Sequence, residues 1–176
     1  MGGAVIGGGM PYIPFPNYNN INQSTIYPAT TTNANVVGIL LPYTISTTKF
    51  AYRVGSTADA TSNVYAVALY NSSGILLMHY SAAATTFASP INTLKVAAWT
   101  IDNGTSTLAP GKYYLMFTSG CSSGCATFTG TGSNVGTFYS YNQVAVVTGG
   151  VPPASITISG FNESFGAQAL SMVFEP

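Results

Sequence analysis

Short runs of β-forming residues, separated by turn residues, recur along most of the chain and constrain its fold more than any other feature. The clearest pair is Val64–Tyr70 (VYAVALY) and Ile75–Tyr80 (ILLMHY), which flank the tetrapeptide Asn71-Ser72-Ser73-Gly74. Two such runs joined by a short polar segment ending in glycine are typical of a β-hairpin. The sequence therefore predicts an antiparallel hairpin over residues 64–80.

The same kind of pattern extends over residues 36–176. Further strands are predicted at Thr44–Val54, Leu94–Ile101, Lys112–Thr118, Ala126–Thr129, Thr137–Tyr141, Val144–Thr148, Ser155–Ser159 and Ala169–Phe174. No stretch has the 3.6-residue period of an amphipathic helix. About ten short strands with Gly, Pro, Asn and Ser turns predict an all-β fold, an antiparallel β-sandwich of the jelly-roll kind.

Residues 1–35 differ in composition from the rest of the chain. Prolines at this density block helices and central strands, so the segment is expected to be extended. A disordered tail is usually poor in aromatic residues, whereas this segment is rich in them, which favours an arm that packs on a neighbouring subunit over a disordered tail. The aromatic residues of the expected arm are Tyr12, Phe15, Tyr18 and Tyr27.

Charged residues make up only 5% of the chain, compared with about 25% in an ordinary soluble domain. The four cations and four anions balance to a net charge of zero and are scattered singly. A DNA-binding surface typically neutralises about six to ten phosphates, and anionic membranes also attract clustered cations. Nucleic acids and membranes are therefore not expected as partners.

The apolar residues do not form a membrane span. The longest candidate, Val36–Tyr43, contains a proline and is much shorter than the roughly 20 residues that a spanning helix needs. The first ten residues lack the basic region of a secretory signal. We therefore expect a soluble protein that folds in the cytoplasm where it is made.

Groups that could support catalysis are isolated in the sequence. The segment Gly120–Gly124 (GCSSG) matches the nucleophile-elbow pattern, but no helix is predicted after it and His79, the only histidine, lies upstream. His79 has no acidic partner near it in sequence. A glycosidase needs two neighbouring carboxylates, and Asp59, Asp102, Glu163 and Glu175 are far apart along the chain. No catalytic residue, metal site or cofactor is predicted, and the protein is not expected to be an enzyme.

Cys121 and Cys125 are the only cysteines. Two thiolates without a nearby histidine cannot complete a four-ligand zinc site. The pair either forms a small disulfide across a tight Gly/Ser turn or remains as two partly buried thiols. A reducing cytoplasm disfavours the disulfide until lysis or export, and both alternatives stay open at this point.

Tyrosine is abundant, with 12 residues in the chain. Tyr139 and Tyr141 alternate on one predicted strand and therefore share a face, next to Asn142 and Gln143. Such a face suits stacking on sugar rings and hydrogen bonding to their hydroxyls. The alternative is that these tyrosines only fill strand positions that favour aromatic residues.

Three segments resemble β-sandwich modules of tailed-bacteriophage virion proteins: Val64–Leu77, Leu108–Phe117 (LAPGKYYLMF) and Gly150–Glu175. The shared pattern is a hairpin of the form ALYxxxGxL followed by LxPGxYYL. The resemblance covers roughly residues 36–176 and carries over no catalytic residue. It implies a jelly-roll protein of the tail-fibre, receptor-binding or capsid-decoration type.

This resemblance sets the functional expectation. The first hypothesis is a virion surface protein, a tail-fibre or receptor-binding module that contacts host glycans. The alternative is a capsid decoration protein whose arm clamps adjacent capsomers, which the absence of a fibre shaft keeps open. Both imply other virion proteins as partners and a homo-oligomer, with a trimer expected from the class, because exposed strand edges need covering. A small glycan-active enzyme is the third hypothesis, from a different class.

Overall fold

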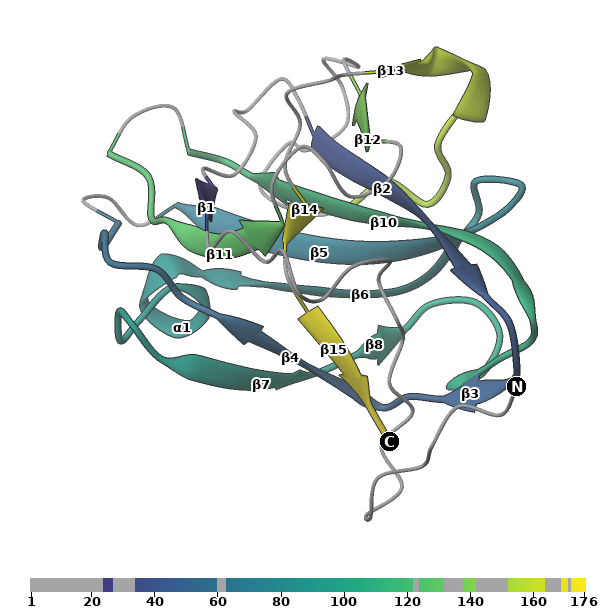
Figure 1. The fold of residues 1–176 in the computed structure, drawn as a ribbon, viewed down its shortest axis with the longest axis horizontal. Helices are drawn as coiled ribbons and strands as arrows, with labels where there is room; N and C mark the ends of the chain where they lie inside the picture. The colour runs from purple at the N-terminus through teal and green to yellow at the C-terminus, as the bar shows by residue number, and fades with distance from the viewer. Residues whose placement is uncertain are drawn as a thin grey trace.

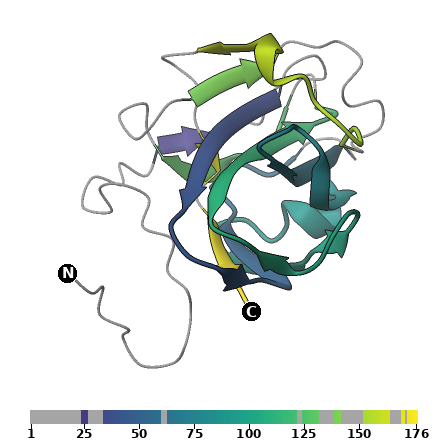
Figure 2. The same cartoon turned by 90° about the vertical axis from the view of Figure 1, so that its right-hand side faces the viewer.

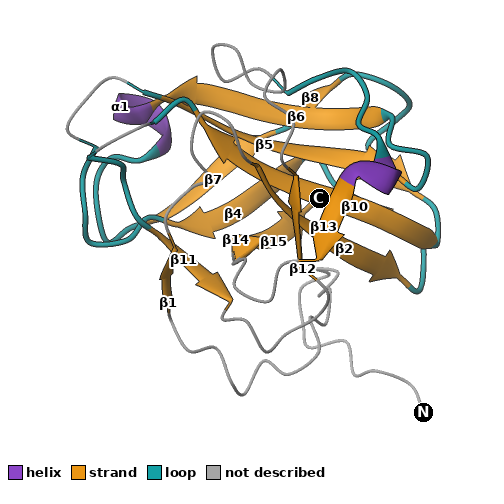
Figure 3. Ribbon diagram, turned by 90° about the horizontal axis from the view of Figure 1, so that it is seen from above, coloured by secondary structure: helices purple, strands orange, loops and turns teal. Residues whose placement is uncertain are grey.

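The computed structural model describes residues 24–26, 34–59, 63–121, 124–131, 138–141, 152–163, 169–170 and 172–176. Strands dominate these residues, and every strand pairing is antiparallel. The only α-helix in the described part is α1 (Ala84–Phe87), a single turn that lies at one end of the molecule (Figure 3). The all-β prediction is confirmed.

The largest sheet has seven strands, in the order β13-β12-β2-β10-β5-β6-β8. In that order the strands are Phe161–Glu163, Phe138–Tyr141, Ala34–Leu41, Gly111–Ser119, Val64–Asn71, Leu76–Ala83 and Thr100–Ile101. The centre of the sheet is formed by β2, β10, β5 and β6, which run side by side (Figure 1). Seen at right angles, β2 and β10 curve around the interior (Figure 2), as expected from the twist of antiparallel strands.

A second sheet has three strands in the order β15-β4-β7, which are Met172–Glu175, Lys49–Arg53 and Leu94–Ala98. Two smaller sheets complete the fold. One joins β1 (Ser24–Ile26), β11 (Phe128–Thr131) and β14 (Ala169–Leu170), and the other joins β3 (Ile45–Ser46) and β9 (Thr107–Leu108). The segment Ser24–Ile26 of the expected arm therefore pairs with β11 of its own chain.

The predicted hairpin is confirmed as β5 and β6, and its turn shows why the sequence folds this way. Asn71 accepts hydrogen bonds through its side-chain oxygen from the backbone N–H groups of Ser73 and Ile75, at 2.9 and 3.0 Å. Gly74 has a φ of +80°, a conformation that glycine adopts without steric cost. The local sequence Asn71–Gly74 thus specifies the turn.

The main core lies between the large sheet and the three-stranded sheet. Buried residues of β2, β5 and β10 pack here with buried residues of β4 and β15. Aromatic rings run through it, with ring centroids 4.2 Å apart for Phe50 and Trp99 and 4.9 Å apart for Tyr52 and Phe87. Large rings bury much apolar area per residue, so these rings contribute strongly to the core between the two sheets.

The opposite face of the large sheet is also covered in its centre. A second buried cluster includes Val36, Tyr70, Met116 and Ile156. The segment that carries Ile156 is fastened by hydrogen bonds from the Tyr70 hydroxyl to the Pro153 carbonyl, 3.0 Å, and from Ile156 N–H to the Gly74 carbonyl, 2.8 Å. Because β5 is buried on both faces, its sequence is a continuous apolar run without polar alternation.

Three predicted strands need correction. Thr44–Val54 is not one strand, because β3 and β4 belong to different sheets. Leu94–Ile101 is not one strand, because β7 and β8 belong to different sheets and the chain crosses between them at Trp99. Ser155–Ser159 is not a strand beyond a single bridge from Ser155 to Ile75, and a 3-10 helix begins at Ile158. The predicted strand Val144–Thr148 lies outside the described residues.

Candidate functional site

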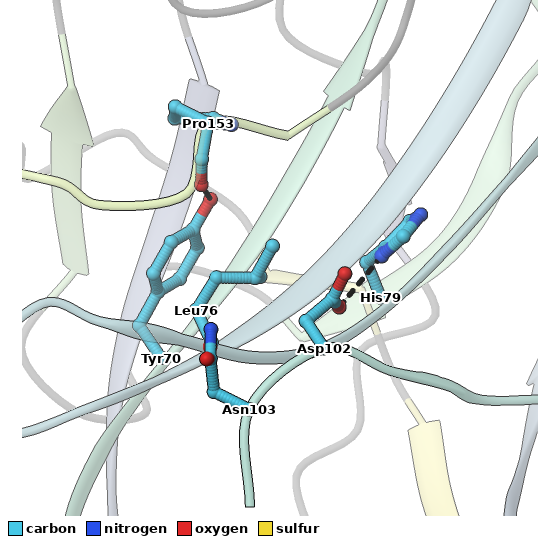
Figure 4. A network of polar contacts seen from close by, with 6 residues as sticks. All are labelled: Tyr70, Leu76, His79, Asp102, Asn103 and Pro153. Atoms are coloured by element: carbon cyan, nitrogen blue, oxygen red, sulfur yellow. Dashed lines mark hydrogen bonds and ion pairs between the residues drawn. The ribbon is translucent and has the colours of Figure 1, made fainter.

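The structure brings together two groups that are distant in sequence, His79 of β6 and Asp102, which follows β8. The His79 Nδ1 atom lies 2.7 Å from Asp102 Oδ2, and the two side chains are 18% and 23% exposed (Figure 4). Sequence reasoning assigned no acid to His79. The pairing depends on β8 lying against β6, a contact that no local pattern predicts.

Further hydrogen bonds fasten the same turn. The N–H groups of Asp102 and Asn103 both donate to the Leu77 carbonyl, at 2.9 and 3.1 Å, and the Asn103 side-chain amide donates to the Leu76 carbonyl at 2.9 Å. Tyr70, bonded to Pro153, lies near this turn (Figure 4). The hydrogen bonds of Asp102 and Asn103 to Leu76 and Leu77 thus anchor the edge strand β8 to the hairpin.

An imidazole oriented by a carboxylate supplies two of the three groups of a nucleophilic catalytic triad, which also needs a hydroxyl or thiol within hydrogen-bond reach. In the part of the chain that the structure describes, no hydroxyl or thiol is hydrogen-bonded to His79. No group of three potential metal ligands occurs there either. The contacts of His79, Asp102 and Asn103 hold β8 against β6.

A second polar cluster surrounds Asp59. The Asn63 side-chain amide donates to both carboxylate oxygens, at 3.1 and 3.2 Å, and the Tyr65 hydroxyl donates to the same carboxylate. The Tyr65 oxygen in turn accepts a hydrogen bond from Ala126 N–H at 2.9 Å. Burial raises the pKa of the Tyr65 hydroxyl, and its hydrogen bond to Asp59 adds to the shift. Asp59 and Asp102 therefore each have their own partners.

The disulfide lies next to this cluster. Cys121 and Cys125 are bonded to each other, with their Cα atoms 5.7 Å apart, so the bridged alternative is the one found. The loop leads into Thr127, whose carbonyl accepts a hydrogen bond from Gly55 N–H at 2.7 Å and whose hydroxyl accepts one from Thr57 N–H at 3.0 Å. The bridge thus closes the loop that positions the start of β11.

The predicted ligand face is located only in part. Tyr139 and Tyr141 lie in β12, where their backbones pair with Val36 and Ala34 of β2 on one side and with β13 on the other. Asn142 and Gln143 lie outside the described residues, as do the arm residues Tyr12, Phe15, Tyr18 and Tyr27. The ligand face and the assembly arm stay predictions.

One surface feature was missed by sequence reasoning. Leu94 and Val96 of β7 are 71% and 53% exposed, and Ile101 of β8 is 41% exposed. An alternating strand would place its apolar residues inward, but β7 turns Leu94 and Val96 outward and Lys95 toward α1, where the ammonium donates to the carbonyls of Thr86 and Ser89. Burial lowers the pKa of Lys95. In the sequence, this segment shows only a single lysine among apolar residues. That pattern does not reveal that Leu94 and Val96 face outward while Lys95 faces α1.

Comparison with known proteins adds no assignment, because no protein-family profile matches the chain and no curated sequence resembles it significantly. Within the described ranges, no helix has the length and apolar character needed to cross a membrane.

Proposed function

We propose that the chain is a non-enzymatic subunit of a bacteriophage virion, a tail-fibre or receptor-binding module that contacts host-surface glycans. The observation that carries the proposal is a sparsely charged surface with exposed apolar side chains on two edge strands, Leu94 and Val96 of β7 and Ile101 of β8. With charged residues at 5% of the chain, there is little like-charge repulsion to keep copies apart. Such a surface suits a protein that is covered in an assembly.

The proposed fold is a jelly-roll β-sandwich. Supporting it are the shared core of the seven-stranded and three-stranded sheets and the crossing of the chain from one sheet to the other at Trp99. Double-sheet jelly rolls of this size serve as capsid and lectin-like domains.

The proposed glycan contacts are Tyr139, Tyr141, Asn142 and Gln143. Support comes from the position of β12 near the border of the large sheet, next to the edge strand β13. Aromatic rings that stack on sugars need accessible faces, and amide side chains next to them supply hydrogen bonds to hydroxyls.

A binding experiment tests this assignment. Purified protein is expected to bind host cells, and the double variant Tyr139→Ala/Tyr141→Ala is expected to lose that binding. Tyr43→Ala is the matched control, because Tyr43 is an exposed tyrosine outside β12. Equal loss in both variants, or binding that survives the double change, would refute the proposed face.

The alternative function is capsid decoration, and one observation favours it. The first described strand, Ser24–Ile26, is fixed to β11, so the 23 residues that precede it start from a defined anchor on the fold. Tyr12, Phe15 and Tyr18 in that segment would clamp adjacent capsomers.

Electron microscopy of virions labelled with an antibody against the protein separates the two functions. Label at the tail tip supports receptor binding, and label over the shell supports decoration. Deletion of the gene gives an independent readout: loss of adsorption supports the first function, whereas capsids that lose heat resistance but adsorb normally support the second.

A further inference from the structure

The strand β7 is an edge strand with an open side. Within the described residues it pairs with β4 alone, and it runs along the lower border of the molecule (Figure 1). An open strand edge presents backbone N–H and C=O groups that can pair with a strand of another chain.

Two hydrogen bonds fix the direction of the β7 backbone. Val54 N–H donates to the Thr93 carbonyl, and Trp99 N–H donates to the Thr48 carbonyl, both at 2.9 Å. Because successive residues of an antiparallel strand direct their backbone groups to opposite sides, the odd-numbered residues of β7 face β4. The residues that direct their N–H and C=O groups to the open side are Leu94, Val96 and Ala98.

The same three residues carry the exposed side chains of the strand. Leu94, Val96 and Ala98 all lie on the outer face of the sheet and are exposed. Backbone groups without a strand partner among the described residues and exposed apolar side chains therefore coincide on alternate residues, which is the arrangement that a fourth strand would cover.

The Lys95 ammonium does not protect the open edge of β7. Edge strands commonly carry a lysine whose ammonium discourages pairing with another strand. Lys95 is the only charged residue of β7, and its ammonium donates to the carbonyls of Thr86 and Ser89 on the inner side of the sheet. The open edge therefore has no charged side chain of its own.

We infer that β7 pairs with β7 of a second copy of this chain, antiparallel and about a two-fold axis at Val96. In this register Val96 lies opposite Val96, and Leu94 of each copy lies opposite Ala98 of the other, so that a large side chain meets a small one on either side of the central valine pair. The arrangement extends the three-stranded sheet to six strands. It is two-fold, unlike the trimer expected from the protein class, and it does not depend on a virion role.

The charges near the axis permit this pairing. The nearest cations of the outer face are Lys49 and Arg53 on β4, which occupy the rows of Ala98 and Leu94. Across the axis, Lys49 of one copy and Arg53 of the other are separated by three strand spacings, about 14 Å, which exceeds the screening length of about 8 Å in physiological salt. The net charge of zero adds no repulsion between copies. An open edge without charged side chains of its own thus fits the same edge of a second copy better than a charged peptide.

Solution mass is the first test. Light scattering over a concentration series is expected to show the mass rising from 18.2 kDa toward twice that value, and Val96→Lys is expected to keep the single-chain mass. Leu40→Lys, at an exposed position on β2, is the control and should still dimerise. A wild-type chain that stays single, or a dimer that survives Val96→Lys, overturns the inference.

Cross-linking tests the register and does not depend on Val96→Lys folding. The native cysteines are bonded to each other, so Val96→Cys adds one free thiol. At the two-fold axis the Cα atoms of two such residues would lie about 5.5 Å apart, within the range of a disulfide. Mild oxidation is expected to give a covalent dimer for Val96→Cys and single chains for Leu40→Cys. Equal cross-linking of both variants, or none for Val96→Cys, overturns the inference.

Discussion

Gly74 lies so close to Ile156 that a Cβ atom on Gly74 would stand 2.1 Å from the Ile156 carbonyl oxygen. The residues belong to segments that are far apart in sequence, the β5–β6 turn and the segment that covers the second face of the large sheet. One glycine therefore serves both the turn and the packing of that segment.

Gly74→Ala is expected to destabilise the fold by about 2–4 kcal/mol, because it adds a steric clash to the cost of a positive φ. Gly104→Ala is the matched control: Gly104 has a φ of +98° but no atom within 4 Å of the added Cβ, so only about 1 kcal/mol is expected. Urea unfolding measures both, and equal losses would contradict the role of Ile156.

Thr118→Val is expected to stabilise the protein. The Thr118 hydroxyl is fully buried and has no hydrogen-bond partner among the described residues. Replacing it with a methyl group of similar size removes a desolvation penalty of about 1 kcal/mol. Thr127→Val is the control, since it breaks the bond from Thr57 N–H and should destabilise by a similar amount. A thermal melt that ranks Thr118→Val below the wild type would refute this.

The His79–Asp102 contact is expected to contribute modestly to stability. A double-mutant cycle with His79→Ala and Asp102→Ala should give a coupling free energy of about 0.5–1 kcal/mol, because the pair is partly exposed and screened by water. Equilibrium unfolding at low and high salt gives the coupling and its screening. A coupling near zero would leave the backbone bonds of Asp102 and Asn103 to Leu77 as the anchor of β8.

Reducing the disulfide is expected to lower the free energy of unfolding by about 2 kcal/mol, the value for closing a loop of five residues in the chain-entropy description. Cys121→Ser/Cys125→Ser should lose a similar amount and, unlike the wild type, should be insensitive to dithiothreitol. Denaturant unfolding with and without reductant measures both effects. A wild-type chain whose stability ignores reductant would contradict a stabilising role for the bridge.

Stability is expected to fall in alkali. Burial raises the pKa of Tyr52 and of Tyr65 above the ordinary value of 10.0. The folded chain therefore keeps these protons where the unfolded chain loses them, so the contribution is complete below pH 10 and is lost as the pH rises above it. Unfolding free energies between about pH 9 and 11 test this, with Tyr52→Phe expected to show a shallower fall. A flat profile would contradict the prediction.

Local patterns were enough to predict the parts of the fold that close over short distances. The hairpin of Val64–Asn71 and Leu76–Ala83 was predicted because its turn residues and β-forming runs are adjacent. Leu94–Ile101 has the pattern of one strand, but the strand breaks at Trp99 because β7 pairs in one sheet and β8 in the other. This break depends on pairing with the distant strands β4 and β6, which the local sequence does not indicate.

The polar sites, too, were predictable only where they depend on residues close together in the sequence. The cysteines were recognised as a possible bridge from their spacing, but only the fold decides between bridge and free thiols. The partnership of His79 with Asp102 requires β8 to lie on β6, so it was not predictable from either residue alone. The inward direction of Lys95 depends on carbonyls around α1, a one-turn helix too short to produce a periodic signal.

The position of β10 has a consequence for how the chain folds during synthesis. It lies between β2 and β5 in the sheet, although both strands precede it in the chain. The partners of β2 in the described sheet, β10 and β12, are both made later. During synthesis β2 therefore has no partner strand of this sheet until β10 has been made. Pairings of this kind are slow because loop closure precedes the gain from contacts. Until β10 is made, both edges of β2 and one edge of β5 lack their partner strands, so the nascent chain exposes strand edges of the kind that promote aggregation.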